Sequence, residues 1–284
     1  ASATIGPIIP PSIPMVIYAL VSGTSVGALF LGGVIPGLLM AVFMMMGVHW
    51  VAVKRNMPRD TSVKWADVPS IVGRGLLPLS LPVVLLTGIY TGKFTPTEAS
   101  ALGAFGAFAL AFWKGKINFQ SLRSALLRSA HGTCMIAMIL FGASIFGYFF
   151  TLTQVTQNLV AWVGSLPVAP WVILTIILFG YIVLGSFMDQ IAILVLTVPI
   201  VLPLIKSLGF DPIWFGVIIV MTVELGLIHP PVGMNVFVIK SVIKDVSFVT
   251  IFKGVIPFIL TDLIRLVILI AFPIIALWLP SQMQ

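Results

Sequence analysis

Long apolar stretches, interrupted mainly by glycine and proline, run through this chain almost from end to end. An α-helix needs about 20 apolar residues to cross the hydrocarbon core of a bilayer. Candidate spanning or half-spanning helices are 26–47, 75–90, 98–113, 133–152, 170–184, 191–205, 214–238 and 255–277. Since 60% of the 284 residues are hydrophobic and only 8% are charged, the sequence predicts an all-α polytopic membrane protein.

Basic residues indicate which side of the membrane each connection faces. Lysines and arginines concentrate in three connections, which the positive-inside rule predicts to be cytoplasmic. They are Lys54, Arg55, Arg59, Lys64 and Arg74 in the first, Lys114, Lys116, Arg123 and Arg128 in the second, and Lys240, Lys244 and Lys253 in the third. The connections around Lys93, 154–169 and 206–211 lack this excess and are predicted to lie outside. The net charge of +7 therefore indicates orientation rather than a nucleic-acid surface.

The segments 170–184 and 191–205 lie between two connections that are both predicted to be outside. The simplest interpretation is a re-entrant hairpin, which enters the membrane from outside and returns there. Its tip, Gly-Ser-Phe-Met-Asp-Gln at 185–190, would lie inside the membrane. Non-helical backbone at that depth is tolerated only where it is buried in protein or lines a cavity.

An internal repeat carries the strongest functional signal. Residues 5–12 read Ile-Gly-Pro-Ile-Ile-Pro-Pro-Ser, and residues 225–232 read Leu-Gly-Leu-Ile-His-Pro-Pro-Val. Both contain Gly-x-x-x-Pro-Pro within an apolar helix. Two successive prolines remove two amide donors and clash with the preceding turn, so each helix is predicted to open into two half-helices.

The connection charges also predict that the two copies run in opposite senses. The first broken segment ends outside, before Val26, and the second ends inside, at Lys240. An inverted pair of Gly/Pro-broken segments indicates a secondary transporter with its binding site near the bilayer midplane. A passive membrane scaffold with proline-kinked helices is the competing interpretation, and two opposed copies with a hairpin favour transport over it.

If a hairpin precedes the second broken segment, symmetry predicts one before the first. The chain begins at Ala1 inside an apolar segment. We therefore expect the numbered chain to be the later part of a longer polypeptide, with the first hairpin upstream.

Polar residues near the breaks have to be weighed one by one. Asp189 can cap the returning half of the hairpin or contribute to an ion site. Glu224 can accept hydrogen bonds from the hairpin tip or help to neutralise a cation, and the structural role is slightly favoured. His229 has no acid partner beside it, so a packed or water-facing histidine is favoured over a proton relay. The other polar residues near the breaks and the hairpin tip, which are candidate ligands for an ion or a substrate, are Ser2, Thr4, Ser12, Ser186, Thr222 and Asn235.

Local patterns add structural detail. Thr95-Pro96-Thr97-Glu98 predicts a capping box at the start of a helix. Segments 119–128 and 247–253 are short, basic and amphipathic, so we expect helices lying on the inner surface. Asp262 and Arg265 can pair on one helix face. Cys134, the only cysteine, is predicted to be a small buried apolar residue.

Motifs for known chemistry are absent from the sequence. It has no nucleotide-binding P-loop, no Gly-x-Ser-x-Gly elbow and no His-Glu-x-x-His pair. We therefore expect a transport protein driven by a gradient, not an enzyme.

Three ordered motifs resemble the large membrane subunit of the tripartite ATP-independent periplasmic (TRAP) transporters. They are Gly-Pro-Ile-Ile-Pro-Pro-Ser-Ile-Pro at 6–14, Gly-Lys-Phe-Thr-Pro-Thr-Glu-Ala at 92–99, and Glu-Leu-Gly-Leu-Ile-His-Pro-Pro-Val-Gly-Met-Asn at 224–235. The resemblance implies a Na⁺-coupled elevator transporter in the bacterial inner membrane that imports an organic acid, of the sialic acid or C4-dicarboxylate class. It also implies a periplasmic binding protein and a small membrane subunit, separate or fused. A carrier that works without a binding protein is the alternative.

The resemblance also implies site residues and segments. Substrate-binding candidates are Ser12, Ser186, Asp189 and Asn235. Candidates for the coupling Na⁺ are Thr4, Gly6, Pro10, Gly185, Ser186, Thr222, Gly226, Pro230 and Gly233. The expected segments are 1–25, the first broken helix; 26–131, scaffold and connecting helices; 132–168, a connecting helix and outer linker; 169–208, the hairpin; 209–240, the second broken helix; and 241–284, an amphipathic segment and terminal scaffold helix.

Overall fold

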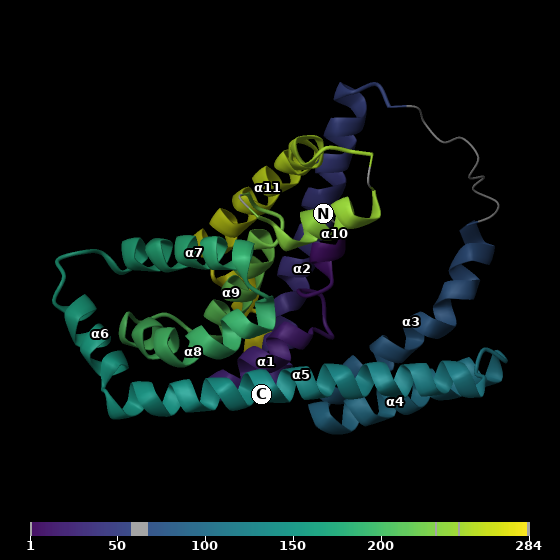
Figure 1. The fold of residues 1–284 in the computed structure, drawn as a ribbon, viewed down its shortest axis with the longest axis horizontal. Helices are drawn as coiled ribbons and strands as arrows, with labels where there is room; N and C mark the ends of the chain where they lie inside the picture. Colours follow the sequence, from purple (N-terminus) through teal and green to yellow (C-terminus); the bar gives the residue numbers. More distant parts are fainter. Residues whose placement is uncertain (1, 58–67, 231, 244, 283–284) are drawn as a thin grey trace. The chain divides into compact units, whose positions relative to one another are not determined.

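The computed structural model describes residues 2–57, 68–230, 232–243 and 245–282, and every regular element in these ranges is a helix (Figure 1). The described chain divides into two compact units, which are treated separately below. One comprises residues 1–51 with 136–284, and the other comprises residues 52–135. Arg59, Lys64, Pro231 and Lys244, which the sequence analysis named, lie outside the described residues.

Five helices of the described chain are long and apolar enough to cross a membrane. They are α2 (Val26–Lys54), α5 (Phe119–Leu152), α7 (Pro170–Phe187), α8 (Gln190–Ser207) and α11 (Phe248–Ala271). The prediction of an all-α polytopic membrane protein is confirmed. The re-entrant placement of α7 and α8, and the segment limits assigned above, stay predictions.

Two segments expected as separate surface helices are instead the first turns of longer helices. Residues 119–128 begin α5, and residues 248–253 begin α11, where Ser247 caps the helix by accepting a hydrogen bond from the Thr250 amide at 3.2 Å. No proline stands at either expected boundary, and a single glycine, Gly132 or Gly254, lies at each. A glycine inside a helix costs about 1 kcal/mol relative to alanine and does not end it as a proline does.

The predicted burial of Cys134 is wrong, because its side chain is exposed. Nearly all of α5 is exposed, although its sequence is strongly apolar. Hydropathy alone does not separate a helix packed inside a protein from one whose apolar surface faces lipid or another chain.

In the unit of residues 52–135, α3 (Val68–Tyr90) packs against α4 (Pro96–Trp113). The turn between them contains Gly92 at φ +68°, and the predicted capping box is present. The Glu98 amide donates to Thr95 Oγ1 at 3.3 Å, while the Thr95 amide donates to Glu98 Oε2 at 2.8 Å. Helix α4 therefore begins at the residue that the sequence predicted.

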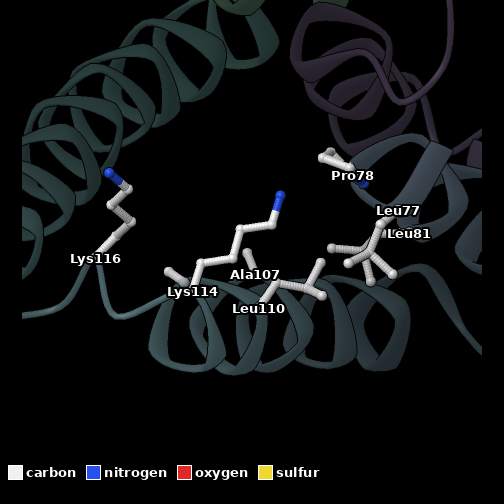
Figure 2. Close-up of a pocket in the computed structure, with 8 residues that line it drawn as sticks. Leu77, Pro78, Leu81, Ala107, Leu110, Lys114 and Lys116 are labelled. Atoms are coloured by element: carbon white, nitrogen blue, oxygen red, sulfur yellow. The ribbon is translucent and has the colours of Figure 1, made fainter. Parts of the chain in front are cut away.

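An apolar groove lies between α3 and α4, and Figure 2 shows the side chains along it. Lys114 and Lys116 are its only charged residues, and the rest of the lining is apolar: Leu77, Pro78, Leu81, Ala107, Leu110 and Ala111. Because the lining offers no carboxylate or hydroxyl, it has no side chain suited to hold a cation. The predicted ion and substrate residues all belong to the other unit.

Helix α9 (Pro212–Gly226) is the core of the unit of residues 1–51 and 136–284. Every residue from Trp214 to Gly226 is buried. Helices α1 (Ile13–Ser22), α7, α8, α11 and α12 (Ile274–Leu277) pack against it. A helix that is apolar on all sides requires such an enclosure.

The remaining elements complete this unit. Helix α6 (Val155–Gly164) packs against α8, and α10 (Met234–Val242) packs against α11. Two short 3₁₀ helices, η1 (Ser2–Ile5) and η3 (Pro280–Gln282), lie near the ends of the described chain. Helix α2 approaches the first Gly-x-x-x-Pro-Pro motif through glycines. A Cβ built on Gly33 would lie 2.7 Å from the Ile8 carbonyl oxygen, and one on Gly37 would lie 2.7 Å from Ile9 Cγ1.

Candidate functional site

The first Gly-x-x-x-Pro-Pro motif separates η1 from α1, as its prolines predict. Ser12 ends the irregular stretch and caps α1. Its side-chain oxygen accepts a hydrogen bond from the Met15 amide at 3.3 Å and donates one to the Pro7 carbonyl. The Pro10–Pro11 peptide bond is cis. Ser12, Pro10 and Thr4 are buried and Gly6 is exposed, so the hydroxyl groups of this break face the protein interior.

The second motif separates α9 from α10. Helix α9 ends at Gly226, and the Asn235 amide reaches back to the Leu227 carbonyl at 3.1 Å. Gly233 precedes α10 at φ +61°, and a Cβ on it would lie 3.1 Å from the His229 oxygen and 3.4 Å from the Leu227 oxygen. Backbone carbonyls therefore converge on Gly233, where a left-handed conformation and close approach both favour glycine.

Helix α7 meets α9 at the second break through two glycines. A Cβ on Gly185 would lie 2.6 Å from the Val223 oxygen, and one on Gly226 would lie 2.6 Å from the Gly185 Cα. The end of α7 and the end of α9 are therefore in direct backbone contact. The structure brings together the tip residue Gly185 and the motif residue Gly226 that the family resemblance had placed in one ion site.

Two hydroxyl groups lie on the last turns of these helices. Ser186 Oγ donates to the Ile182 carbonyl at 3.1 Å, and Thr222 Oγ1 donates to the Ile218 carbonyl at 2.7 Å. Both residues are buried, at 1% and 0% exposure. A hydroxyl that donates its proton within its helix still has oxygen lone pairs for a second partner.

The helix after the tip begins with a polar pair. Asp189 caps α8, since its carboxylate accepts from the Ile191 amide at 2.9 Å, and its side chain is exposed. The capping alternative for Asp189 is thus present in the structure. Gln190 follows it, is buried, and donates from Nε2 to the Val220 carbonyl of α9 at 3.1 Å. Gln190 therefore fixes the start of α8 on the broken helix.

The four substrate-binding candidates do not form one bonded cluster. Ser12 and Ser186 are buried, Asp189 is exposed, and Asn235 is half-buried. No hydrogen bond joins any two of them in the described chain. Of the Na⁺ candidates, Gly185, Ser186, Thr222, Gly226 and Gly233 are buried around the second break, and Pro230 is exposed. Their ligand roles stay predictions.

The first repeat also contacts the second. Helix α1 packs against α8 and α9, and Tyr18 donates from its hydroxyl to the Pro212 carbonyl at 2.7 Å. A Cβ on Gly216 would lie 2.5 Å from the Tyr18 ring. The sequence analysis missed Tyr18 and Gln190. Gln190 had a visible signal, a polar amide within an apolar hairpin, whereas nothing local distinguishes Tyr18.

A family comparison decides the class of protein. Residues 1–275 match the family described as "Tripartite ATP-independent periplasmic transporter, DctM component". The chain belongs to this family. The TRAP resemblance that the three ordered motifs indicated is thereby confirmed.

Curated TRAP proteins match nearly the whole chain. The C4-dicarboxylate TRAP transporter large permease protein DctM of Pseudomonas aeruginosa is 37% identical over 281 residues, 99% of this chain and 66% of the relative. The sialic acid TRAP transporter large permease protein SiaM of Vibrio cholerae is 34% identical over 282 residues, again 99% and 66%. The isethionate TRAP transporter permease protein DctMQ of Oleidesulfovibrio alaskensis is 33% identical over 282 residues, 98% of this chain and 44% of the relative.

The chain thus spans about two thirds of the length of the first two relatives, at 66% each. All three relatives are transporter permeases rather than enzymes, in agreement with the expectation from the motifs.

Proposed function

We propose that this chain is the part of a TRAP large permease that carries an organic acid anion across the bacterial inner membrane together with Na⁺. The observation that carries the proposal is the meeting of α7 and α9 at Gly185 and Gly226, directly beside the second break. Both helices end there, and helix C-termini carry partial negative charge from unpaired carbonyls. Two such ends side by side favour a cation.

The ligand set at this point suits Na⁺. Oxygens are available from the buried hydroxyls of Ser186 and Thr222 and from the carbonyls that converge on Gly233. Hard cations prefer oxygen ligands, and unwound carbonyls of broken helices are a recurrent way to supply them. In the described residues there is no group of three or more His, Cys, Asp or Glu side chains placed to hold a metal ion.

The same region offers an anion its complement. Helix α10 begins just after the break, and a helix N-terminus carries partial positive charge, whereas the N-terminus of α8 is already capped by the Asp189 carboxylate. A substrate carboxylate facing the N-terminus of α10, with Na⁺ at the C-termini of α7 and α9, would be stabilised by both charges. We assign the substrate side to Ser12, Ser186, Asp189 and Asn235 as above.

The packing within this unit supports the proposal of an elevator motion. Helices α1, α7 and α8 all pack on α9, so the predicted hairpin and both broken segments share one core. We infer that this body moves as one piece against the rest of the transporter. A periplasmic binding protein would deliver the substrate, and a small membrane subunit, separate or fused as in DctMQ, would brace the remainder.

The test is uptake by proteoliposomes that contain the full-length permease with its small subunit. Uptake of radiolabelled C4-dicarboxylates, sialic acid and isethionate is measured with an inward Na⁺ gradient, with and without the binding protein. We expect one substrate class to accumulate only with both Na⁺ and the binding protein. Equal uptake when K⁺ replaces Na⁺ would overturn the coupling, and equal uptake without the binding protein would favour the independent carrier.

A further inference from the structure

The groove between α3 and α4 has its charged and its apolar residues at opposite ends. Its volume is about 370 Å³. Figure 2 shows Lys114 and Lys116 at one end, the side chains of α3 at the other, and Ala107 and Leu110 between them. Of the described residues that line it, none is acidic or carries a hydroxyl group. Such a lining suits an elongated ligand that is anionic at one end and apolar along the rest.

The turn that ends α4 brings the two lysines to the same end of the groove. Gly115 has φ +63°, and the Lys116 amide donates back to the Ala111 carbonyl at 3.0 Å. This is the Schellman pattern, in which a left-handed glycine reverses the chain over the last turn of a helix. The Lys114 amide donates to the Leu110 carbonyl at 3.1 Å. These carbonyls have backbone partners, so the lysine ammonium groups are not needed to satisfy them.

The residues around the charged end are typical of a membrane–water interface. Helix α4 ends at Trp113, whose side chain is 77% exposed, and tryptophan is enriched where a bilayer meets water. The connection that carries both lysines is one of the three predicted to be cytoplasmic. Ala107 precedes Lys114 by seven residues, which is about 10 Å along a helix axis. The apolar end of the groove is therefore expected to lie at the depth of the acyl chains.

We propose that this groove binds one anionic phospholipid, with its phosphate at Lys114 and Lys116 and an acyl chain along the apolar lining. Lysine ammonium groups donate strong hydrogen bonds to phosphate oxygens, and basic pockets between helices on the cytoplasmic side suit anionic headgroups. Lipid tails are as apolar as leucine, so the apolar lining does not distinguish one phospholipid from another. The two lysines therefore supply the selectivity, and the groove fixes where the chain lies.

This proposal goes beyond the proposed transport function and does not depend on which ion or substrate is carried. The competing explanation is that Lys114 and Lys116 act only as general positive charge on the cytoplasmic surface. In that case, any pair of basic residues on the same surface would attract anionic lipid equally. A built site requires the lysines that line the groove and also requires the groove to be open.

The experiment uses the full-length permease with its small subunit in phosphatidylcholine nanodiscs. Photoactivatable phosphatidylglycerol or phosphatidylcholine, with identical acyl chains that carry a diazirine, is added at increasing mole fraction, and cross-linked peptides are identified by mass spectrometry. We expect labelling of residues 77–81 in α3 to reach half its maximum at an about 30-fold lower mole fraction of the phosphatidylglycerol probe. Each lysine near an anionic headgroup contributes about fivefold.

The decisive variant is the double substitution Lys114→Gln with Lys116→Gln, which should abolish the preference for the phosphatidylglycerol probe. Its matched control is Arg123→Gln with Arg128→Gln. The control removes two exposed positive charges on the same predicted side of the membrane, outside the groove lining, and should keep the preference. An equal loss of preference in the two double variants would show a general effect of surface charge and would overturn the site.

A second variant tests the apolar part of the groove. Ala107→Phe keeps both lysines but fills the groove, so it should abolish labelling of residues 77–81 by either probe. Ala109→Phe, at an exposed position of α4 outside the lining, should leave the labelling unchanged. Equal labelling of the wild type by the two probes would overturn the proposal. No labelling of the wild-type groove would also overturn it, and is the result expected if another protein segment covers the groove. The lysine variants test the site by themselves should Ala107→Phe fail to fold.

Discussion

The two Gly-x-x-x-Pro-Pro breaks share a sequence pattern but are anchored by different interactions. The first is held by a hydroxyl and by α2. Ser12 bonds both the Pro7 carbonyl and the Met15 amide, and Gly33 admits the Ile8 carbonyl. The second has no side-chain cap on α10, where Gly233 occupies the capping position. It is held by contact with α7 at Gly226.

The prolines determine where each helix opens, whereas the contacts around each break determine how firmly its backbone is fixed. At the first break, a bonded hydroxyl cap within the same chain segment adds to the contact with α2. At the second break, the position of the backbone depends on another element of the fold, the end of α7. We therefore expect the second break to respond more strongly to changes at a distance in sequence.

The largest expected effect tests that dependence directly. In Gly226→Ala, the new Cβ would lie 2.6 Å from the Gly185 Cα and 2.7 Å from the Ile182 oxygen. Both are backbone atoms, so α7 and α9 must separate. We expect a loss of about 2–3 kcal/mol in the free energy of unfolding, and at least a tenfold loss of Na⁺-dependent uptake. Denaturation of the full-length protein in detergent and proteoliposome uptake measure the two.

The matched control is Gly180→Ala in α7, where a Cβ meets nothing within 4 Å. An alanine inside a helix is favoured over glycine by up to about 1 kcal/mol, so this variant should be neutral or slightly stabilised. If Gly226→Ala behaved like Gly180→Ala, the close contact of α7 with the second break would be refuted.

The equivalent change at the first break is Gly33→Ala in α2. Its Cβ would lie 2.7 Å from the Ile8 oxygen and 2.7 Å from Met15 Cε. The methionine can shift but the carbonyl cannot, so we expect a loss of about 1–2 kcal/mol in unfolding free energy. Gly47→Ala, with its nearest contact at an ordinary 3.4 Å, should be neutral or slightly stabilised, like Gly180→Ala. A larger loss of stability in Gly33→Ala than in Gly226→Ala would show that the first break, and not the second, depends more on contact with another helix.

A smaller difference is expected between Gly233→Ala and its control, Gly23→Ala. Both glycines have positive φ, at +61° and +69°, and a left-handed alanine costs about 1–2 kcal/mol. Only Gly233 is crowded, by the His229 oxygen at 3.1 Å, whereas Gly23 meets nothing within 4 Å. Thermal unfolding should therefore show a slightly larger loss for Gly233→Ala. Equal losses of stability in the two variants would mean that the carbonyls around Gly233 can shift to admit a Cβ at no cost.

The smallest effect concerns the hydroxyl cap. Ser12→Ala removes the bond to the Met15 amide and leaves the Pro7 carbonyl without that partner. Replacing a capping serine by alanine costs about 1 kcal/mol. Ser144→Ala, an exposed serine that bonds only within its own turn of α5, serves as the control and should be near neutral. A neutral Ser12→Ala would show that α2 alone anchors the first break.

Interactions between near neighbours in sequence were predictable. The prolines at 10–11 and 230–231, the capping box at Thr95 and the ion pair of Asp262 with Arg265 all follow from rules about residues a few positions apart. Both breaks, the capping box and the ion pair are present. The family assignment was predictable for the same reason, because its motifs are continuous in sequence.

Features that depend on tertiary packing were not predictable. The sequence near Gln190 gives no sign that its side chain donates to the Val220 carbonyl of α9, as it does at 3.1 Å. The continuity of α5 and α11 was missed because the basic, amphipathic starts of these helices were interpreted as separate segments on the membrane surface. Burial of Cys134 was misjudged because apolar character does not reveal which neighbour, protein or lipid, a side chain faces.

The contact between Gly185 and Gly226 has one further consequence, which concerns entropy. Side chains that lock together on packing lose rotamer freedom, up to about 2 kcal/mol for the longest ones, and regain it on separation. Two glycines that touch through their backbones have no rotamers to lose or recover. The end of α7 can therefore part from α9 and return without a side-chain entropy term from these two residues on either step.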